Sequence, residues 1–205
     1  MENNIIELFG KVVGEITLNH EIKGEKFYSL FLEVERLSSI KDTLEVIISE
    51  KLLFDIQEGT YVDIKGEIRT YNQMVENRNK LLITVFVKTI QVVTDPATIK
   101  ESLATNNVQL RGFVCKKPLY RLTPFGKQIS DILLAVNRRF LKSDYIPCIA
   151  WGRNAAYSDH FEVGKEIELV GRLQSREYTK YLEDGTTEIR TAYEVSILNI
   201  TAVEE

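Results

Sequence analysis

Residues 164–173 read GKEIELVGRL, and they repeat a pattern found earlier in the same chain. Residues 59–68 read GTYVDIKGEI, so that a glycine, alternating apolar residues and a second glycine recur at a spacing of 105. Such alternation is typical of a strand with one buried face. Because one pattern occurs twice in 205 residues, the sequence predicts two copies of one all-β domain.

The repeat extends over most of both halves. A closing strand, Leu82–Val87, matches Ala192–Ile197 at a spacing of 110, and five other residues recur at a spacing of 102. These five are Leu8, Gly10, Val34, Arg36 and Asp42, which match Leu110, Gly112, Val136, Arg138 and Asp144. The spacing grows only where loops lengthen, as expected of a duplicated domain.

Each half is predicted to form about five strands and one short helix. In the first half we expect strands near 5–17, 26–37, 43–49, 61–71 and 80–93, with the helix at 50–57; residues 153–161 form the matching helix. This is the strand and helix order of the OB barrel, which binds oligonucleotides. We therefore predict two tandem OB-fold five-stranded barrels, residues 1–94 and 107–205, each with a short helix between strands 3 and 4. The linker is 95–106, where Asp95 and Pro96 can start a short helix.

The composition, 44% hydrophobic and 27% charged, is that of a soluble globular protein. No apolar run is long enough to span a membrane, and the start MENNIIELFG lacks the basic residues of a signal peptide, so we expect a cytoplasmic protein. The two halves differ in charge. Residues 1–104 carry 17 acidic and 12 basic side chains, whereas residues 105–205 carry 13 and 14. The second half is the better candidate for binding a polyanion.

Aromatic and basic residues gather in this second half. In DYIPCIAW, residues 144–151, strand alternation would place Tyr145, Pro147, Ile149 and Trp151 on one face. Rings that stack on bases, beside cations that follow phosphates, are typical of single-stranded nucleic-acid sites. The candidate cations are Arg138, Arg139, Lys142, Arg153, Arg172 and Arg176, and a second basic group, Lys116, Lys117, Arg121 and Lys127, brackets a hairpin loop.

Residues 107–203 resemble the bacterial single-stranded-DNA-binding protein family. The resemblance rests on an ordered set of motifs: Leu110 with Gly112, Pro118, Thr123 with Gly126, LAVNR at 134–138, DYIPCIAWG at 144–152, GRLQSREY at 171–178 and YEV at 193–195. It implies base-stacking roles for Phe140, Tyr145, Trp151 and Tyr178. The alternative for any one aromatic is a place in the core, but four together, flanked by cations, favour a binding surface. The resemblance also implies assemblies of four barrels, which this chain would reach as a homodimer.

The first half lacks this aromatic set. The counterparts of the four aromatics are Ser38, Thr43, Ser49 and Gln73. With its acidic balance, this barrel is predicted to be a scaffold or a surface for partners. Phe27, Tyr28, Phe31 and Tyr71 leave open a DNA-binding role, against which Glu33 and Glu35 argue.

The leading hypothesis is sequence-independent binding and protection of single-stranded DNA in replication, recombination or repair, at the nucleoid and mainly through the second barrel. The alternative is an accessory subunit of a replication or recombination complex whose barrels mainly bind protein; replication or repair proteins are possible partners in both cases. The sequence contains no HExxH, GxSxG or phosphate-loop pattern. We therefore expect no enzyme, no metal and no other cofactor.

Overall fold

Strands make up most of both halves of the chain. A computed structural model describes residues 2–75, 78–95, 105–138, 142–181 and 185–204. The first half contains β1 (Asn4–Ile22), β2 (Glu25–Glu35), β3 (Lys41–Ser49), the 3-10 turn η1 (Glu50–Leu52), β4 (Tyr61–Val75) and β5 (Arg78–Val92). The second half contains β6 (Asn106–Val114), β7 (Leu119–Leu122), β8 (Gln128–Asn137), β9 (Ser143–Trp151), the helix α2 (Arg153–Ser158), β10 (Glu166–Tyr181) and β11 (Thr187–Ala202). The linker helix expected from Pro96 onward lies outside the described residues.

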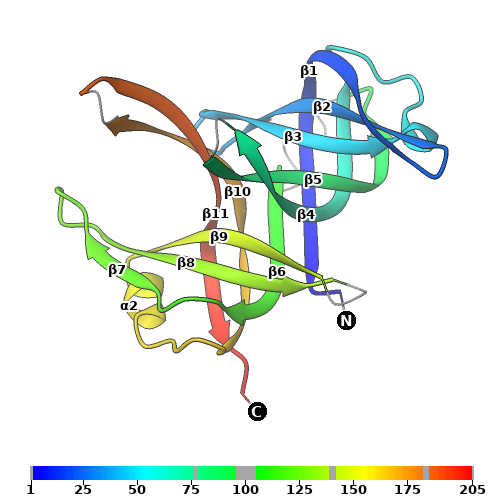
Figure 1. The fold of residues 1–205 in the computed structure, drawn as a ribbon. Coiled ribbons are helices and arrows are strands. Elements are labelled where there is room, and N and C mark those ends of the chain that lie inside the picture. The colour runs from blue at the N-terminus through cyan, green and yellow to red at the C-terminus, as the bar shows by residue number, and fades with distance from the viewer. Residues whose placement is uncertain (1, 76–77, 96–104, 139–141, 182–184, 205) are drawn as a thin grey trace.

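The strand pairings close into a ring in each half (Figure 1). In the first barrel the order is β1-β2-β3-β5-β4 and back to β1. In the second barrel the order is β6-β8-β9-β11-β10 and back to β6, with β7 paired to β8 outside the ring. In both rings the third and fifth of the five strands pair in parallel. The all-β prediction and its strand order are confirmed.

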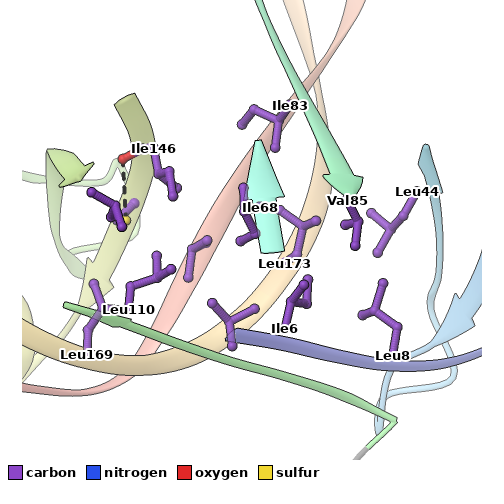
Figure 2. Packing of buried hydrophobic residues seen from close by; sticks show 14 of the residues in the cluster. Ile6, Leu8, Leu44, Ile68, Ile83, Val85, Leu110, Ile146, Leu169 and Leu173 are labelled. Atoms are coloured by element: carbon purple, nitrogen blue, oxygen red, sulfur yellow. Dashed lines mark hydrogen bonds between the residues drawn. The ribbon is translucent and has the colours of Figure 1, made fainter. Parts of the chain in front are cut away.

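One hydrophobic cluster fills both barrels, as Figure 2 shows. It follows the alternation that the sequence predicted, because every second residue of each strand points inward. Ile6 in β1, Ile68 in β4 and Leu173 in β10 are at most 2% exposed and lie where the barrels meet. The two barrels therefore share a continuous core.

The predicted helices are shorter than expected. In place of the helix predicted at 50–57, the chain forms only η1, and the backbone of Asp55 turns to a φ of +54°. A left-handed residue ends any right-handed helix, which explains the failure. In the second half, α2 ends at Ser158, three residues before the predicted boundary.

The first strand extends farther than predicted, whereas the second ends two residues earlier. β1 and β2 continue beyond the barrel as a hairpin arm that ends at Ile22 and Glu25. Lys23 and Gly24 both have positive φ, which fits a two-residue hairpin turn whose twist matches the strands. The arm carries Asn19 and His20 beside the first barrel.

The barrels are joined about a pseudo-two-fold axis. β1 pairs with β6 antiparallel, with Asn4 opposite Leu110, Ile6 opposite Val108 and Leu8 opposite Asn106. Ile6 and Val108 are themselves counterparts at the repeat spacing of 102, so each half presents the same strand to the other. Two self-complementary surfaces that meet in this way define an isologous contact, as in a C2 dimer.

Asparagine side chains close this contact on both sides. Asn4 donates from Nδ2 to the Ile68 carbonyl at 2.8 Å and accepts from the Ile68 amide at 2.9 Å. Asn106 makes the same two bonds with Leu173, at 2.6 and 2.9 Å. Each asparagine thereby satisfies a backbone donor and acceptor where β4 and β10 pass the junction.

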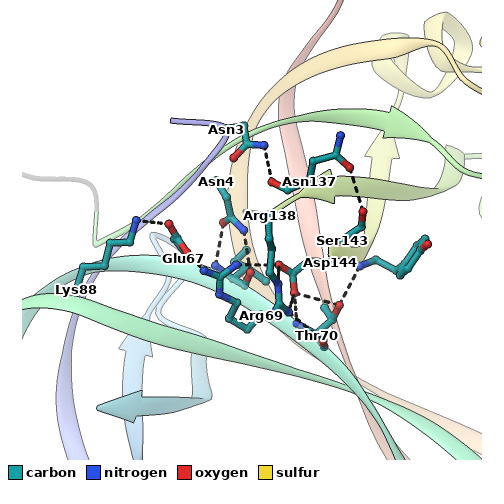
Figure 3. Close-up of polar contacts among 12 residues, drawn as sticks. Asn3, Asn4, Glu67, Arg69, Thr70, Lys88, Asn137, Arg138, Ser143 and Asp144 are labelled. Atoms are coloured by element: carbon teal, nitrogen blue, oxygen red, sulfur yellow. Dashed lines mark hydrogen bonds and ion pairs between the residues drawn. The ribbon is translucent and has the colours of Figure 1, made fainter. Parts of the chain in front are cut away.

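A buried carboxylate on each barrel reaches across to the other, and Figure 3 shows the one of the second barrel, Asp144. Asp42 bonds Arg36 in its own barrel and accepts from the Ser175 amide of the second barrel at 2.7 Å. Asp144 bonds Arg138 and accepts from the Thr70 amide of the first barrel at 2.6 Å. Both carboxylates have fully buried side chains. The repeated Arg and Asp residues therefore build the junction between the barrels.

Two matched glycines are required by close backbone approach. A Cβ at Gly66 would lie 2.3 Å from the Phe86 carbonyl oxygen, and one at Gly171 would lie 2.4 Å from that of Ser196. Both positions coincide with a shift in strand register. The second glycine of the repeated pattern, Gly66 and Gly171, therefore marks a bend in each barrel.

Candidate nucleic-acid interface

The outer face of β9 carries the predicted aromatics. Tyr145 is 49% exposed and Trp151 is 41% exposed, while the intervening Ile146 and Cys148 point into the core. Pro147 and Ile149 lie on the same face as the aromatics, although Ile149 itself is covered. Strand alternation therefore places the two rings outward, at opposite ends of the strand.

The face continues across β11 onto β10. Ile149 is level with Ser196 of β11, which lies opposite Arg172 of β10, so these three residues share one side of the sheet. Farther along β10, every second residue returns to this side, which places Arg176 and Tyr178 there. The Arg176 guanidinium lies 5.8 Å from the centre of the Tyr178 ring, and Tyr178 is 39% exposed.

The predicted cations have different surroundings. Lys142 and Arg153 are exposed, whereas the buried Nε of Arg172 has no hydrogen-bond partner. Arg138 is held by Asp144 and by the Thr70 carbonyl, so its charge is used at the junction. Arg139 and Phe140 lie outside the described residues.

The hairpin of β7 and β8 adds a second basic group, as the sequence suggested. Lys116, Lys117 and Lys127 are exposed, while Arg121 pairs with Asp131 at 2.7 Å. At its tip, Phe125 is 92% exposed. Sequence reasoning overlooked this ring, although its place between Pro124 and Gly126 marks the tip of a turn.

The first barrel presents aromatics from different strand positions. Ser49 and Thr43 stand where the second barrel has Trp151 and Tyr145, but Phe27, Phe86 and Tyr71 lie on the corresponding outer face by register. Of the rings singled out in the sequence, Tyr28 packs against the core and so cannot belong to this face. Phe86 and His20 were missed because their counterparts in the second half are not aromatic.

Within the described ranges, no three His, Cys, Asp or Glu side chains gather as a metal site. Burial raises the pKa of the Cys148 thiol, so it stays protonated and is unsuited to bind a metal or attack a substrate. The helices in the described part of the chain are too short or too polar to cross a membrane.

Comparisons with known proteins found similar sequences and a similar fold. Residues 105–203 match the Single-strand binding protein family. Single-stranded DNA-binding protein B of Bacillus subtilis (strain 168) is 32% identical over 80 residues, covering 36% of this chain and 71% of that protein. The chain belongs to the single-strand binding protein family. Single-stranded DNA-binding protein 1 of Staphylococcus aureus (strain COL), a longer family member, is 38% identical over 80 residues, 36% of this chain and 48% of that protein.

The chain spans about half the length of most of the curated relatives that it matches. A solved structure resembles both barrels in fold. The wild-type single-stranded DNA binding protein from Thermus aquaticus matches 98% of this chain and 93% of that chain, with a TM-score of 0.77 and 18% identity. At this identity the likeness concerns the fold, and it includes the first half, which the family match does not cover.

Proposed function

We propose that the protein binds and protects single-stranded DNA without sequence preference, mainly through the second barrel, and acts in replication, recombination or repair. The observation that carries this proposal is the outer face of β9, β11 and β10. It exposes Tyr145, Trp151, Tyr178 and Arg176, and it also carries the partly buried Arg172. The printed names of the relatives support the same ligand. Within this proposal the protein acts by binding and has no catalytic activity.

We assign the aromatics to bases and the cations to the backbone. Tyr145, Trp151, Tyr178 and Phe140 would stack on bases, each contributing roughly 1–3 kcal/mol. Arg139, Lys142, Arg153, Arg172 and Arg176 would donate hydrogen bonds to phosphates. Arg138 is reassigned from this group to the junction, because Asp144 already neutralises it.

The first barrel would serve mainly as a scaffold and a partner surface. Residues 1–94 form it in this proposal, 95–106 link it to the second barrel, and 107–205 carry the DNA site. A homodimer would bring four barrels together, and replication or repair proteins would be further partners, in the cytoplasm at the nucleoid. The acidic balance of the first half favours the alternative of an accessory subunit that mainly binds protein.

Titration of the full chain with a labelled dT oligonucleotide tests the proposal. Trp151→Ala and Tyr145→Ala should each weaken binding by roughly 1–3 kcal/mol. Phe54→Ala is the matched control, since Phe54 is 70% exposed but lies on the first barrel, away from this face. If both variants bind like the control, the assigned face is wrong. A wild-type chain that does not bind at low salt would favour the accessory subunit.

The cations are tested by the salt dependence of the same titration. Arg172→Gln should reduce the slope of log K against log salt by about 0.7, as expected for one lost phosphate contact with a single strand. Arg111→Gln is the control, because Arg111 pairs with Glu166 at 2.9 Å and with Glu168 at 3.2 Å. Equal slopes for wild type and Arg172→Gln would remove Arg172 from the site.

A further inference from the structure

A cavity of about 440 Å³ lies on the outer face of the first barrel, next to the junction. Its walls come from the hairpin arm of β1, from β3, β4 and β5, and from Arg138 of the second barrel. This volume falls in the usual range for small-ligand sites. The first barrel and its arm therefore form most of the lining, and Arg138 adds a side chain from the second barrel.

Aromatic rings form much of its lining. Phe86 and Tyr71 line it from β5 and β4, and His20 lines it from the arm. Outside it, Phe27 links the rings: it stacks on His20 at 4.9 Å with an interplanar angle of 10°, and lies 5.7 Å from Phe86. Burial, followed by the charge of Glu45, raises the pKa of Tyr71 and keeps its phenol neutral. These surfaces suit a flat aromatic ligand.

The cations that line the cavity are already paired. Arg69 bonds Glu67 and Asp144, and Arg138 bonds the same Asp144. Lys88, outside the lining, also bonds Glu67. Neither guanidinium of the lining is therefore left unpaired for a phosphate. Thr84 and Asn19 add polar atoms that can bond the edge of a neutral ring. The chemistry of the cavity therefore favours a neutral heterocycle over an anion.

The matching place in the second barrel is filled. There Glu194 replaces Thr84, and its carboxylate accepts from Gln174, the counterpart of Arg69, at 3.2 Å. Both side chains are 6% exposed. Ser196 stands where the first barrel has Phe86. The smaller Thr84 and the aromatic Phe86 thus accompany a ring-lined cavity in the first barrel.

The cavity lies next to the strand that carries Tyr145 of the proposed DNA face. Thr70, which lines the cavity, accepts a hydrogen bond at its hydroxyl from the Tyr145 amide at 2.9 Å (Figure 3). A strand that stacks on Tyr145 would thus pass directly beside the opening. We propose that this cavity takes one unpaired nucleobase from the strand bound by the second barrel. The inference rests on the proposed function and adds a site on the first barrel to it.

Two measurements on the full chain test this inference. A dT oligonucleotide of about 35 residues exceeds the roughly 4–16 nucleotides covered by one OB barrel, so it can reach both surfaces. Two variants remove a ring from the cavity: Phe86→Ser, which introduces the serine that the second barrel has at Ser196, and Tyr71→Ser. Each should weaken binding of this oligonucleotide roughly tenfold, the effect of one lost stacked base. Phe54→Ser is the control on the same barrel, and Trp151 emission reports whether each variant is folded.

Photo-crosslinking separates the inference from the proposed function. An oligonucleotide that carries 5-bromodeoxyuridine should form adducts at Tyr71 or Phe86 in addition to residues of the second barrel. Adducts confined to the second barrel, with both serine variants binding like Phe54→Ser, would overturn the cavity site and leave the proposed function standing. If the wild-type chain neither binds the oligonucleotide nor forms adducts, both fail.

Discussion

Replacing Asp42 by asparagine should destabilise both barrels. The substitution keeps the shape of the side chain but removes the charge that Arg36 bonds at 2.6 Å. Removing one partner of a buried ion pair costs about 3–5 kcal/mol, and we expect about 3 kcal/mol here because 14% of the Arg36 side chain reaches water. The oxygen of asparagine can still accept from the Ser175 amide, so the loss should come from the ion pair.

Urea denaturation followed by Trp151 fluorescence measures this loss. Trp151 lies in the second barrel while Asp42 lies in the first. The unfolding transition that Trp151 reports should therefore shift only if the junction couples the unfolding of the two barrels. Lys41→Gln is the matched control: the adjacent pair of Lys41 with Glu33 is exposed, and such pairs contribute about 0–1 kcal/mol. A free energy of unfolding for Asp42→Asn within error of that control would refute the role of this carboxylate.

The same variant should also change the acid sensitivity of the protein. Burial opposes ionisation of Asp42, but hydrogen bonds from Arg36 and Ser175 outweigh it and lower the pKa of the carboxyl. A lowered folded pKa stabilises the protein above the ordinary aspartate value, about 3.9, and that stability is lost as pH falls through the folded value. The stability difference between wild type and Asp42→Asn should therefore shrink below about pH 4. A constant difference down to acid unfolding would contradict this assignment.

Three further predictions concern the ligand, the backbone and the assembly. Single-stranded oligonucleotide should quench the emission of Trp151, the only tryptophan, whereas duplex should change it little; unchanged emission at saturation would contradict its place on the binding face. Gly66→Ala and Gly171→Ala should each lower the free energy of unfolding by about 1–3 kcal/mol in urea titrations, because the new Cβ meets a carbonyl oxygen; neutral variants would show that the bends can relax. Light scattering should give a mass near twice the 23.6 kDa chain with or without DNA, and a monomer at micromolar concentration would defeat the homodimer.

The barrels could be predicted from the sequence because the residues that define each strand lie close together along the chain. Alternating apolar residues and the repeated glycines lie within single strands, so a period of two and a fixed spacing reveal them. The same alternation placed Tyr145 and Trp151 outward. It overestimated the helix at 50–57, where apolar spacing fitted a helix but the left-handed backbone of Asp55 could not be read from the residues.

Features that depend on distant contacts were not predictable. Arg36 and Asp42 were recognised as repeated residues, yet their bonds to Ser175 join positions 133 or more residues apart. Arg138 was grouped with the DNA-binding cations because the sequence does not show that Asp144, six residues along the chain, bonds it, or that both reach Thr70 in the other half. The cavity was missed because an outward-facing residue is predictable by alternation, whereas a hollow depends on which side chains three strands and an arm bring together.

Because the two halves that meet at the pseudo-two-fold junction belong to one chain, each half can acquire substitutions without the other. In a true homodimer a single gene encodes both sides of the axis, so every substitution is made twice and a surface lost on one side is lost on the other. In this chain a substitution is made once. Asn4 and Asn106 keep the two sides alike at the contact, while Thr84 and Glu194 differ beside it. The covalent link therefore allows the molecule to keep dimer-like geometry while its two halves acquire different chemistry.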